Sequence, residues 1–133
     1  MPSRFYSSLA RCSSCFIKRH RVARIYHITS RQEADGAGKT GAYEPAAFGR
    51  EGFIHCSYAH QVIAVANRIF RGRPDLVLLE IDPAELDCVV VDENLEGGST
   101  LFPHIYGRLK MSAVTRIYDF PCDGNGEFSA LPK

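Results

Sequence analysis

A helix followed by a buried strand is the pattern of residues 57–81, SYAHQVIAVANRIFRGRPDLVLLEI. Apolar residues recur at helical spacing on one face of its first part, at Val62, Val65, Ala66, Ile69 and Phe70. Ser57 is a candidate N-cap for this helix, and Gly72 and Pro74 supply the stop expected just past its C-terminus. Residues 76–81, LVLLEI, then predict a central strand that is buried on both faces.

Two strands are predicted upstream of this helix. Residues 25–29, IYHIT, alternate as in a strand and are expected to begin the folded part of the chain. Ser30 is expected to cap a short helical turn, with Glu33 at the position that a capping box uses and glycines at 36, 38 and 41 ending the turn. Residues 41–52 are irregular and predict a loop, after which Phe53 begins the second strand.

Strands alone are predicted downstream of residue 81. Residues 89–91, VVV, form one strand, residues 96–100 a polar turn, and residues 113–120 a last strand. About five strands and one firm helix predict an α+β fold with a mostly antiparallel sheet. A chain of 133 residues with 45% hydrophobic content is long enough to bury one core, so a single compact domain over residues 25–133 is expected.

The charge of the chain is uneven along its length. Residues 1–24 hold six basic residues and no acidic one, which leaves ten bases against 15 acids, a formal charge of −5, from residue 25 onward. A basic, serine-rich start is typical of an organellar transit peptide; the alternative is a basic tail without a targeting role. We therefore expect a mitochondrial or other organellar matrix if residues 1–24 are a transit peptide, and the cytoplasm otherwise. The acidic remainder gives no support by charge to an RNA partner.

The five cysteines are an odd number without the dense spacing of a disulfide scaffold, which indicates free thiols in a reducing compartment. Cys12 and Cys15 have the C-x-x-C spacing, but no second pair completes a zinc site. No apolar run approaches the ~20 residues that a membrane-spanning helix requires, so no membrane partner is expected.

Polar reactive groups lie in the second strand, within GFIHCS at residues 52–57. Alternation places His55 and Ser57 on one face of this strand and Cys56 on the other. An imidazole and a hydroxyl would then lie at the mouth of the helix N-terminus, whose free amides favour a phosphate or another anion. The structural alternative is that Ser57 only caps the helix and that His55 is a satisfied core histidine.

Two more histidines lie in similar surroundings, His27 in YHIT and His104 in FPHIYG at residues 102–107. Three imidazoles from separate segments could hold a metal ion, although their spacing is unspecific and no acidic partner is fixed. A hydrolase with Ser57 as nucleophile lacks the Gly-x-Ser-x-Gly elbow, and alternation turns the Cys56 thiol away from the neighbouring histidine. The three histidines form one site if they open into one cleft, and they do not if they lie on opposite faces of a sheet.

In their order along the chain, these motifs resemble a family catalogued as domain of unknown function 952. The resemblance runs from about Ile25 to Phe120 and rests on IYHIT, GFIHCS, QVIAVANRIF, DLVLLEID and FPHIYG. The fold of that family is similar to the ADP-ribosyltransferase fold. YHIT resembles the Tyr-His-Gly-Thr strand with which poly-ADP-ribose polymerases and RNA 2′-phosphotransferases hold the ribose of NAD, so the resemblance implies an ADP-ribosyltransferase-like domain.

The resemblance also implies roles for individual residues. His27 and Thr29 would bind the ribose or the nicotinamide side of NAD, and Ser57 would lie near the diphosphate or the nicotinamide ribose. Tyr106 would contact the nucleotide as well. His55 and His104 would be the catalytic residues that transfer protons.

Two departures from the transferase pattern bear on catalysis. Ile28 stands where the polymerases have glycine, which would narrow the pocket beside the ligand. FPHIYG occupies the region where those transferases offer a late glutamate. His104 is the candidate replacement, and Glu93 and Glu96 lie nearby in the sequence.

The sequence therefore predicts a pocket for a small nucleotide, NAD or an ADP-ribose-like molecule, in a transferase that moves a glycosyl or phosphoryl group from NAD. Arg50 and Arg108 are the candidates for binding a phosphate, as arginines do in the 2′-phosphotransferases; the alternative is a solvent-exposed structural role for each. The alternative from another class is a non-catalytic domain that senses a nucleotide or contacts a protein. A histidine-ligated metal protein is a third alternative.

Overall fold

The computed structural model describes residues 22–133, and its central element is an antiparallel sheet of four strands in the order β4-β1-β5-β9. β1 (Ile25–Ser30) and β5 (Leu76–Ile81) pair along their full length in the middle of this sheet. The short strand β4 (Ser57–Tyr58) and the longer strand β9 (Val114–Asp119) form its edges.

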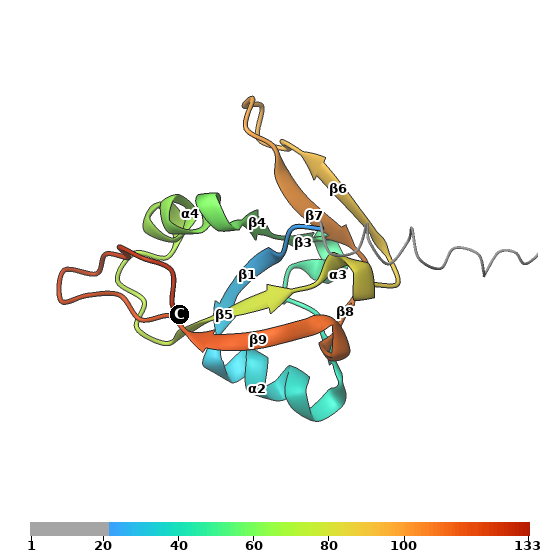
Figure 1. Cartoon of the computed structure of the whole chain (residues 1–133), viewed down its shortest axis with the longest axis horizontal. Coiled ribbons are helices and arrows are strands. Elements are labelled where there is room, and N and C mark those ends of the chain that lie inside the picture. Colours follow the sequence, from blue (N-terminus) through green and yellow to red (C-terminus); the bar gives the residue numbers. More distant parts are fainter. Residues whose placement is uncertain (1–21) are drawn as a thin grey trace, which may run out of the picture.

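Three further strands form a second antiparallel sheet in the order β3-β7-β6. They are β3 (Ile54–His55), β7 (Phe102–Tyr106) and β6 (Val89–Glu93). In Figure 1, β6 and β7 rise away from the central sheet. A separate two-stranded ladder joins β2 (Ala42–Tyr43) to β8 (Leu109–Lys110). The prediction of a small α+β domain with antiparallel strands is confirmed.

Helices cover both faces of the central sheet. α4 (Val62–Ile69) lies on one side and α2 (Arg31–Thr40) on the other, as Figure 1 shows. α3 (Phe48–Glu51) is a single turn ahead of β3. The 3-10 turns are η2 (Ala59–Gln61), η3 (Pro83–Glu85) and η4 (Met111–Ala113).

Each helix packs on its own apolar cluster. Ala34 and Leu79 belong to the cluster on the α2 side, whereas Ala66 and Leu78 belong to the cluster on the α4 side. Alternate residues of β5 therefore enter two different clusters. The central strand predicted from the unbroken apolar run at residues 76–81 is confirmed.

α2 is longer than the short turn that the sequence predicts. Its N-cap is Ser30, as predicted, and the Ser30 Oγ accepts a hydrogen bond from the Glu33 N–H at 3.1 Å. The helix continues through Gly36 and Gly38 and ends only at Gly41, where φ is 89°. Burial of alanines from α2 offsets the low helix propensity of the two internal glycines.

The strand predicted from Phe53 to Ser57 is divided between the two sheets. β3 pairs with β7, β4 pairs with β1, and Cys56 lies between them. The N-cap predicted at Ser57 is wrong, because Ser57 pairs within β4 and a 3-10 turn separates it from α4. The side chain of Gln61 stabilises that turn instead, since its Oε1 accepts a hydrogen bond from the Tyr58 N–H at 2.9 Å.

Residues 102–107 contain β7, a strand that the sequence analysis did not predict. β7 is the inner strand of its sheet although Pro103, which is fully buried, has no N–H to donate to a ladder. The predicted loop at residues 41–52 contains β2 and α3. The strands predicted at residues 89–91 and 113–120 are confirmed as β6 and β9.

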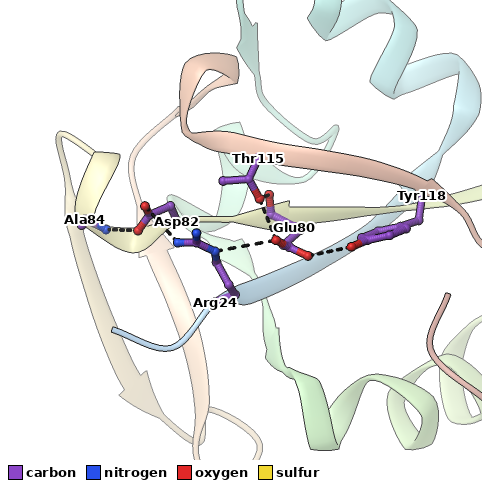
Figure 2. Close-up of polar contacts among 6 residues, drawn as sticks. All are labelled: Arg24, Glu80, Asp82, Ala84, Thr115 and Tyr118. Atoms are coloured by element: carbon purple, nitrogen blue, oxygen red, sulfur yellow. Dashed lines mark hydrogen bonds and ion pairs between the residues drawn. The ribbon is translucent and has the colours of Figure 1, made fainter. Parts of the chain in front are cut away.

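Arg24 joins the first described residues to the central sheet (Figure 2). Its Nη1 lies 2.9 Å from Asp82 Oδ2, and its Nε lies 3.6 Å from Glu80 Oε2. Glu80 also accepts hydrogen bonds from Thr115 Oγ1 at 2.8 Å and from the Tyr118 hydroxyl at 2.9 Å. Contacts of the domain thus extend to Arg24, and residues 1–21 of the predicted transit peptide lie outside the described residues.

The described part of the chain contains three cysteines, and Cys56, Cys88 and Cys122 are free thiols, as predicted. Cys12 and Cys15 lie outside the described residues. Among residues 22–133, no helix combines the length and the apolar composition that crossing a membrane requires.

Candidate functional site

A cavity opens where the two sheets separate. β4 pairs with β1 at only two positions, Ile25 with Tyr58 and Tyr26 with Ser57. The strand just before it in the chain, β3, pairs with β7 of the other sheet instead. The side of β1 beyond Tyr26 is therefore left without a partner among the described strands. The cavity lies along this free side and is closed by the second half of α4 and by the loop that joins β6 to β7.

His27, His55 and His104 all line this cavity, together with Ser57. Three histidines from separate segments thus meet at one site, which is the geometric condition that the sequence analysis set. Apolar side chains complete the wall: Ile28, Val65, Ile69, Phe70, Leu95 and Phe102.

Thr29 and Tyr106, both predicted to bind the nucleotide, lie outside this cavity. Thr29 lines a neighbouring hollow, and His27, Ile28 and Phe70 line both spaces. Tyr106 lines neither space; its exposed hydroxyl donates to Glu93, and this hydrogen bond raises the Tyr106 pKa. The site therefore has Thr29 beside it, whereas Tyr106 is separate from it.

His27 is buried and has both ring nitrogens bound. Nδ1 lies 2.6 Å from the backbone oxygen of His55, and Nε2 lies 2.9 Å from the Tyr43 hydroxyl. A carbonyl oxygen can only accept, so Nδ1 carries the proton and Nε2 accepts from Tyr43. Burial lowers the His27 pKa to about 4, which keeps the ring neutral. His27 thus joins β1 to β3. A ligand in the cavity can contact the His27 ring, but both ring nitrogens are already hydrogen-bonded within the protein.

A chain of hydroxyl groups extends from His27 to the surface. The Tyr43 hydroxyl has one proton, which is used on His27, so only the Thr29 proton is left for its 3.0 Å contact with Thr29 Oγ1. Thr29 Oγ1 also lies 2.6 Å from Glu33 Oε1. Burial raises the pKa of Tyr43. Sequence reasoning missed Tyr43, which lies in a strand of two residues within the predicted loop, and assigned Glu33 only to helix capping.

His55 and His104 face each other across β3 and β7, with ring centroids 5.1 Å apart. The Phe53 ring packs nearly perpendicular to both imidazoles, at centroid distances of 4.9 and 5.2 Å. His55 is exposed, and its Nε2 lies 3.5 Å from Glu51 Oε1. His104 is only 3% exposed, and its Nδ1 is buried without a hydrogen-bond partner. These two predicted catalytic residues are therefore adjacent, and one of them has an unsatisfied nitrogen.

The anion site predicted at the mouth of the helix is wrong. α4 begins only at Val62 and contributes Val65, Arg68 and Ile69, from its middle and its end, to the cavity wall. Its N-terminal amides therefore do not face the cavity near Ser57. Arg68 supplies positive charge at the mouth, where its Nη1 lies 3.7 Å from Glu96 Oε1 and both side chains are exposed.

The described part of the structure does not support three other predicted or alternative features: phosphate-binding arginines, a metal site and a cysteine nucleophile. Arg50 and Arg108 do not line the cavity, and Arg108 pairs with Glu44 at 2.6 Å. Within residues 22–133, no three His, Cys, Asp or Glu side chains are grouped closely enough to hold a metal ion. Cys56 is part of the apolar core, where burial raises the pKa of its thiol and disfavours a nucleophilic thiolate.

Comparison with known proteins connects the chain to one family. The model of a family described as "Protein of unknown function (DUF952)" matches residues 28–117. The crystal structure of protein CC0527 from Caulobacter crescentus is similar, with 38% sequence identity over 80% of this chain and 93% of that chain and a TM-score of 0.71. Its solution NMR structure gives 39% identity over 77% and 89% of the two chains and a TM-score of 0.68. No curated protein matches the chain.

Proposed function

The chain belongs to the DUF952 family of proteins of unknown function, and we propose that it binds a nucleotide, NAD or an ADP-ribose-like molecule, in the cavity between its two sheets. The observation that carries this proposal is the meeting of His27, His55 and His104 at one cavity. Polar groups that converge on an otherwise apolar pocket are the usual mark of a small-molecule site.

The size of the cavity supports a ring as the enclosed part of the ligand. Its volume is ≈ 120 Å³. For comparison, a cavity of ~150 Å³ holds one benzene molecule in another protein. This smaller space encloses at most one six-membered heteroaromatic ring, such as the ring of nicotinamide, and the sugar and phosphate groups then lie outside it. The rings of His55, His104 and Phe102 offer aromatic surface for such a ring.

Polar groups beside the cavity suit the rest of a nucleotide. Across the wall formed by His27, the Thr29 hydroxyl and the Glu33 carboxylate line the neighbouring hollow, and such groups hydrogen-bond sugar hydroxyls. At the mouth, the Arg68 side chain is 54% exposed, and its pairing with Glu96 at 3.7 Å is weak. Arg68 can therefore exchange that partner for a phosphate.

The same proposal makes the domain ADP-ribosyltransferase-like, with the YHIT strand β1 forming one side of the NAD site. The reaction would be glycosyl or phosphoryl transfer from NAD, with His55 and His104 moving protons. Among the described residues, Glu96 is the acid that lines the cavity. Glu80 is not available for this role, because Thr115 and Tyr118 hold its carboxylate at 2.8 and 2.9 Å (Figure 2).

One observation favours the second candidate, a non-catalytic domain that senses a nucleotide. Both ring nitrogens of His27 are bound within the protein, at 2.6 and 2.9 Å. A neutral, fully hydrogen-bonded histidine stabilises the shape of a pocket and offers no free nitrogen for chemistry. Both the transferase and the sensing domain would therefore bind the nucleotide, and only the transferase would convert it to products.

Isothermal calorimetry with NAD and with ADP-ribose tests the proposal. Val65→Phe adds bulk to the cavity wall and is expected to weaken binding by at least about tenfold. Ala64→Phe is the matched control, because Ala64 is an exposed neighbour on the same helix that does not line the cavity. Binding of neither ligand, or equal weakening by both variants, contradicts the proposal. Chromatography detects any nicotinamide that is released from NAD. Release supports the transferase, whereas binding of NAD without release of nicotinamide supports the sensing domain.

A further inference from the structure

One buried polar atom stands out among the side chains of residues 22–133. Nδ1 of His104 is the buried side-chain nitrogen or oxygen without a hydrogen-bond partner in this part of the chain. Leaving a buried polar atom unpaired is costly, and native proteins seldom do so without a functional reason. His104 also lines the cavity proposed as the nucleotide site.

The charged group nearest to this atom is a carboxylate. Glu93 Oε2, on the neighbouring strand β6, lies 3.7 Å from His104 Nδ1, which is too long for a hydrogen bond but close enough for attraction. The same oxygen accepts a hydrogen bond from the Tyr106 hydroxyl. The rings of His55, at 5.1 Å, and Phe53, at 5.2 Å, also pack on His104.

The carboxylate selects one tautomer of His104. A carboxylate offers only lone pairs, so the proton of a neutral imidazole is more stable on Nδ1, beside Glu93, than on Nε2. Nδ1 is buried away from solvent, and His104 contributes to the cavity wall. Nε2 is then the nitrogen left to meet a ligand, and it carries a lone pair.

We propose that Glu93 is a positioning residue that holds His104 in the Nδ1–H form, so that Nε2 accepts a hydrogen bond from an N–H of the ligand. This inference rests on the proposed function and narrows it: the enclosed ring carries an N–H donor, such as a carboxamide or an exocyclic amine. A ring of the same shape with a methyl group or hydrogen in place of that amine leaves Nε2 unpaired and is expected to bind more weakly.

The tautomer is tested first, without any ligand, by long-range ¹H–¹⁵N correlation spectra of the protein labelled at histidine. His104 is expected to carry its proton on Nδ1 at pH 8, and Glu93→Ala is expected to move the proton to Nε2. Tyr106→Phe is the matched control, because it keeps the carboxylate and removes only the hydroxyl bound to it. A proton on Nε2 in the unaltered protein, or no change in Glu93→Ala, overturns the inference whatever the protein binds.

Ligand preference is tested with two pairs of compounds that differ in one group. NAD is compared with 3-acetylpyridine adenine dinucleotide, in which methyl replaces the carboxamide amine, and AMP is compared with purine riboside monophosphate, which lacks the exocyclic amine. The amine-bearing member of at least one pair is expected to bind about fivefold more tightly, and Glu93→Ala to abolish that preference. Equal affinity within both pairs overturns this inference and leaves the proposed function standing. If none of the four compounds binds and ADP-ribose does not bind either, both fail.

Discussion

The Nδ1 atom of His27 in β1 lies 2.6 Å from the backbone oxygen of His55 in β3, so one imidazole joins the two sheets at the place where they separate. The opposite nitrogen of the ring is bound by Tyr43 from the β2 ladder at 2.9 Å. Three segments that are distant in the sequence are thus connected by a single side chain. The first two predictions below depend on this connection.

Replacing His27 is expected to destabilise the fold. His27→Ala removes the partner of the His55 carbonyl and one of the partners of the Tyr43 hydroxyl, and it creates a small cavity. These losses should lower the free energy of unfolding by about 2–4 kcal/mol. Urea denaturation measures the change. His60→Ala is the control, since His60 is exposed, and a change within about 0.5 kcal/mol is expected. Equal effects of the two substitutions would show that His27 does not join the sheets.

His27 should also make stability depend on pH. The pKa of His27 is about 4 in the folded protein, below the 6.5 of an unperturbed histidine, which is the value expected in the unfolded chain. Between these values the unfolded chain binds more protons than the folded one, so stability is full above pH 6.5 and falls as pH decreases toward 4. The loss attributable to His27 between pH 7 and pH 5 is about 2 kcal/mol. Denaturation of the protein and of His27→Gln at both values measures it, and identical pH slopes would contradict the account.

Cys56 should resist alkylation in the folded protein. Burial raises the pKa of its thiol, and its side chain belongs to the apolar core. Since only the thiolate reacts, iodoacetamide is expected to modify Cys56 at least about tenfold more slowly than the half-buried Cys122. Mass spectrometry of peptides follows both sites, and urea should remove the difference. Fast modification of native Cys56 would place it outside the core.

Asn94 is expected to hold the loop that closes the cavity. Its Oδ1 accepts from the backbone N–H groups of Glu96 and Gly98, both at 2.9 Å, and its Nδ2 donates to the Thr100 carbonyl at 2.6 Å. Asn94→Ala should speed hydrogen exchange of residues 95–100 by about tenfold while changing global stability by less than about 1 kcal/mol. Asn125→Ala, in another exposed turn, is the control and should leave this loop unchanged.

The parts of the fold that sequence reasoning predicted have strong local patterns. α4 and β5 follow from apolar periodicity and from the stop at Gly72 and Pro74, because their burial is regular along the chain. The division of residues 53–57 was not predictable, since alternation continues through Cys56 while the pairing partner changes from β7 to β1. β7 was missed because its proline argues against an inner strand.

The candidate site shows the same limit. The GFIHCS and FPHIYG motifs indicated His55 and His104, and the structure brings these residues together with His27. The second hydrogen bond of the His27 ring comes from Tyr43, which lies in a strand of only two residues, and no local sequence pattern predicts that contact. The error over Ser57 came from reading a helix start into a segment that pairs with β1. Contacts between distant segments, rather than periodicity, determine what each imidazole can do.

A titration of the protein with NAD or ADP-ribose, monitored by ¹H–¹³C spectra of the histidine rings, tests the central claim most directly. If the cavity binds a nucleotide, NAD or ADP-ribose should shift the ring signals of His27, His55 and His104 with one common dissociation constant. His60 does not line the cavity and is an internal control that should not shift with them. Unchanged signals of the three histidines at saturating concentrations of both ligands, or shifts confined to His60, would contradict the account.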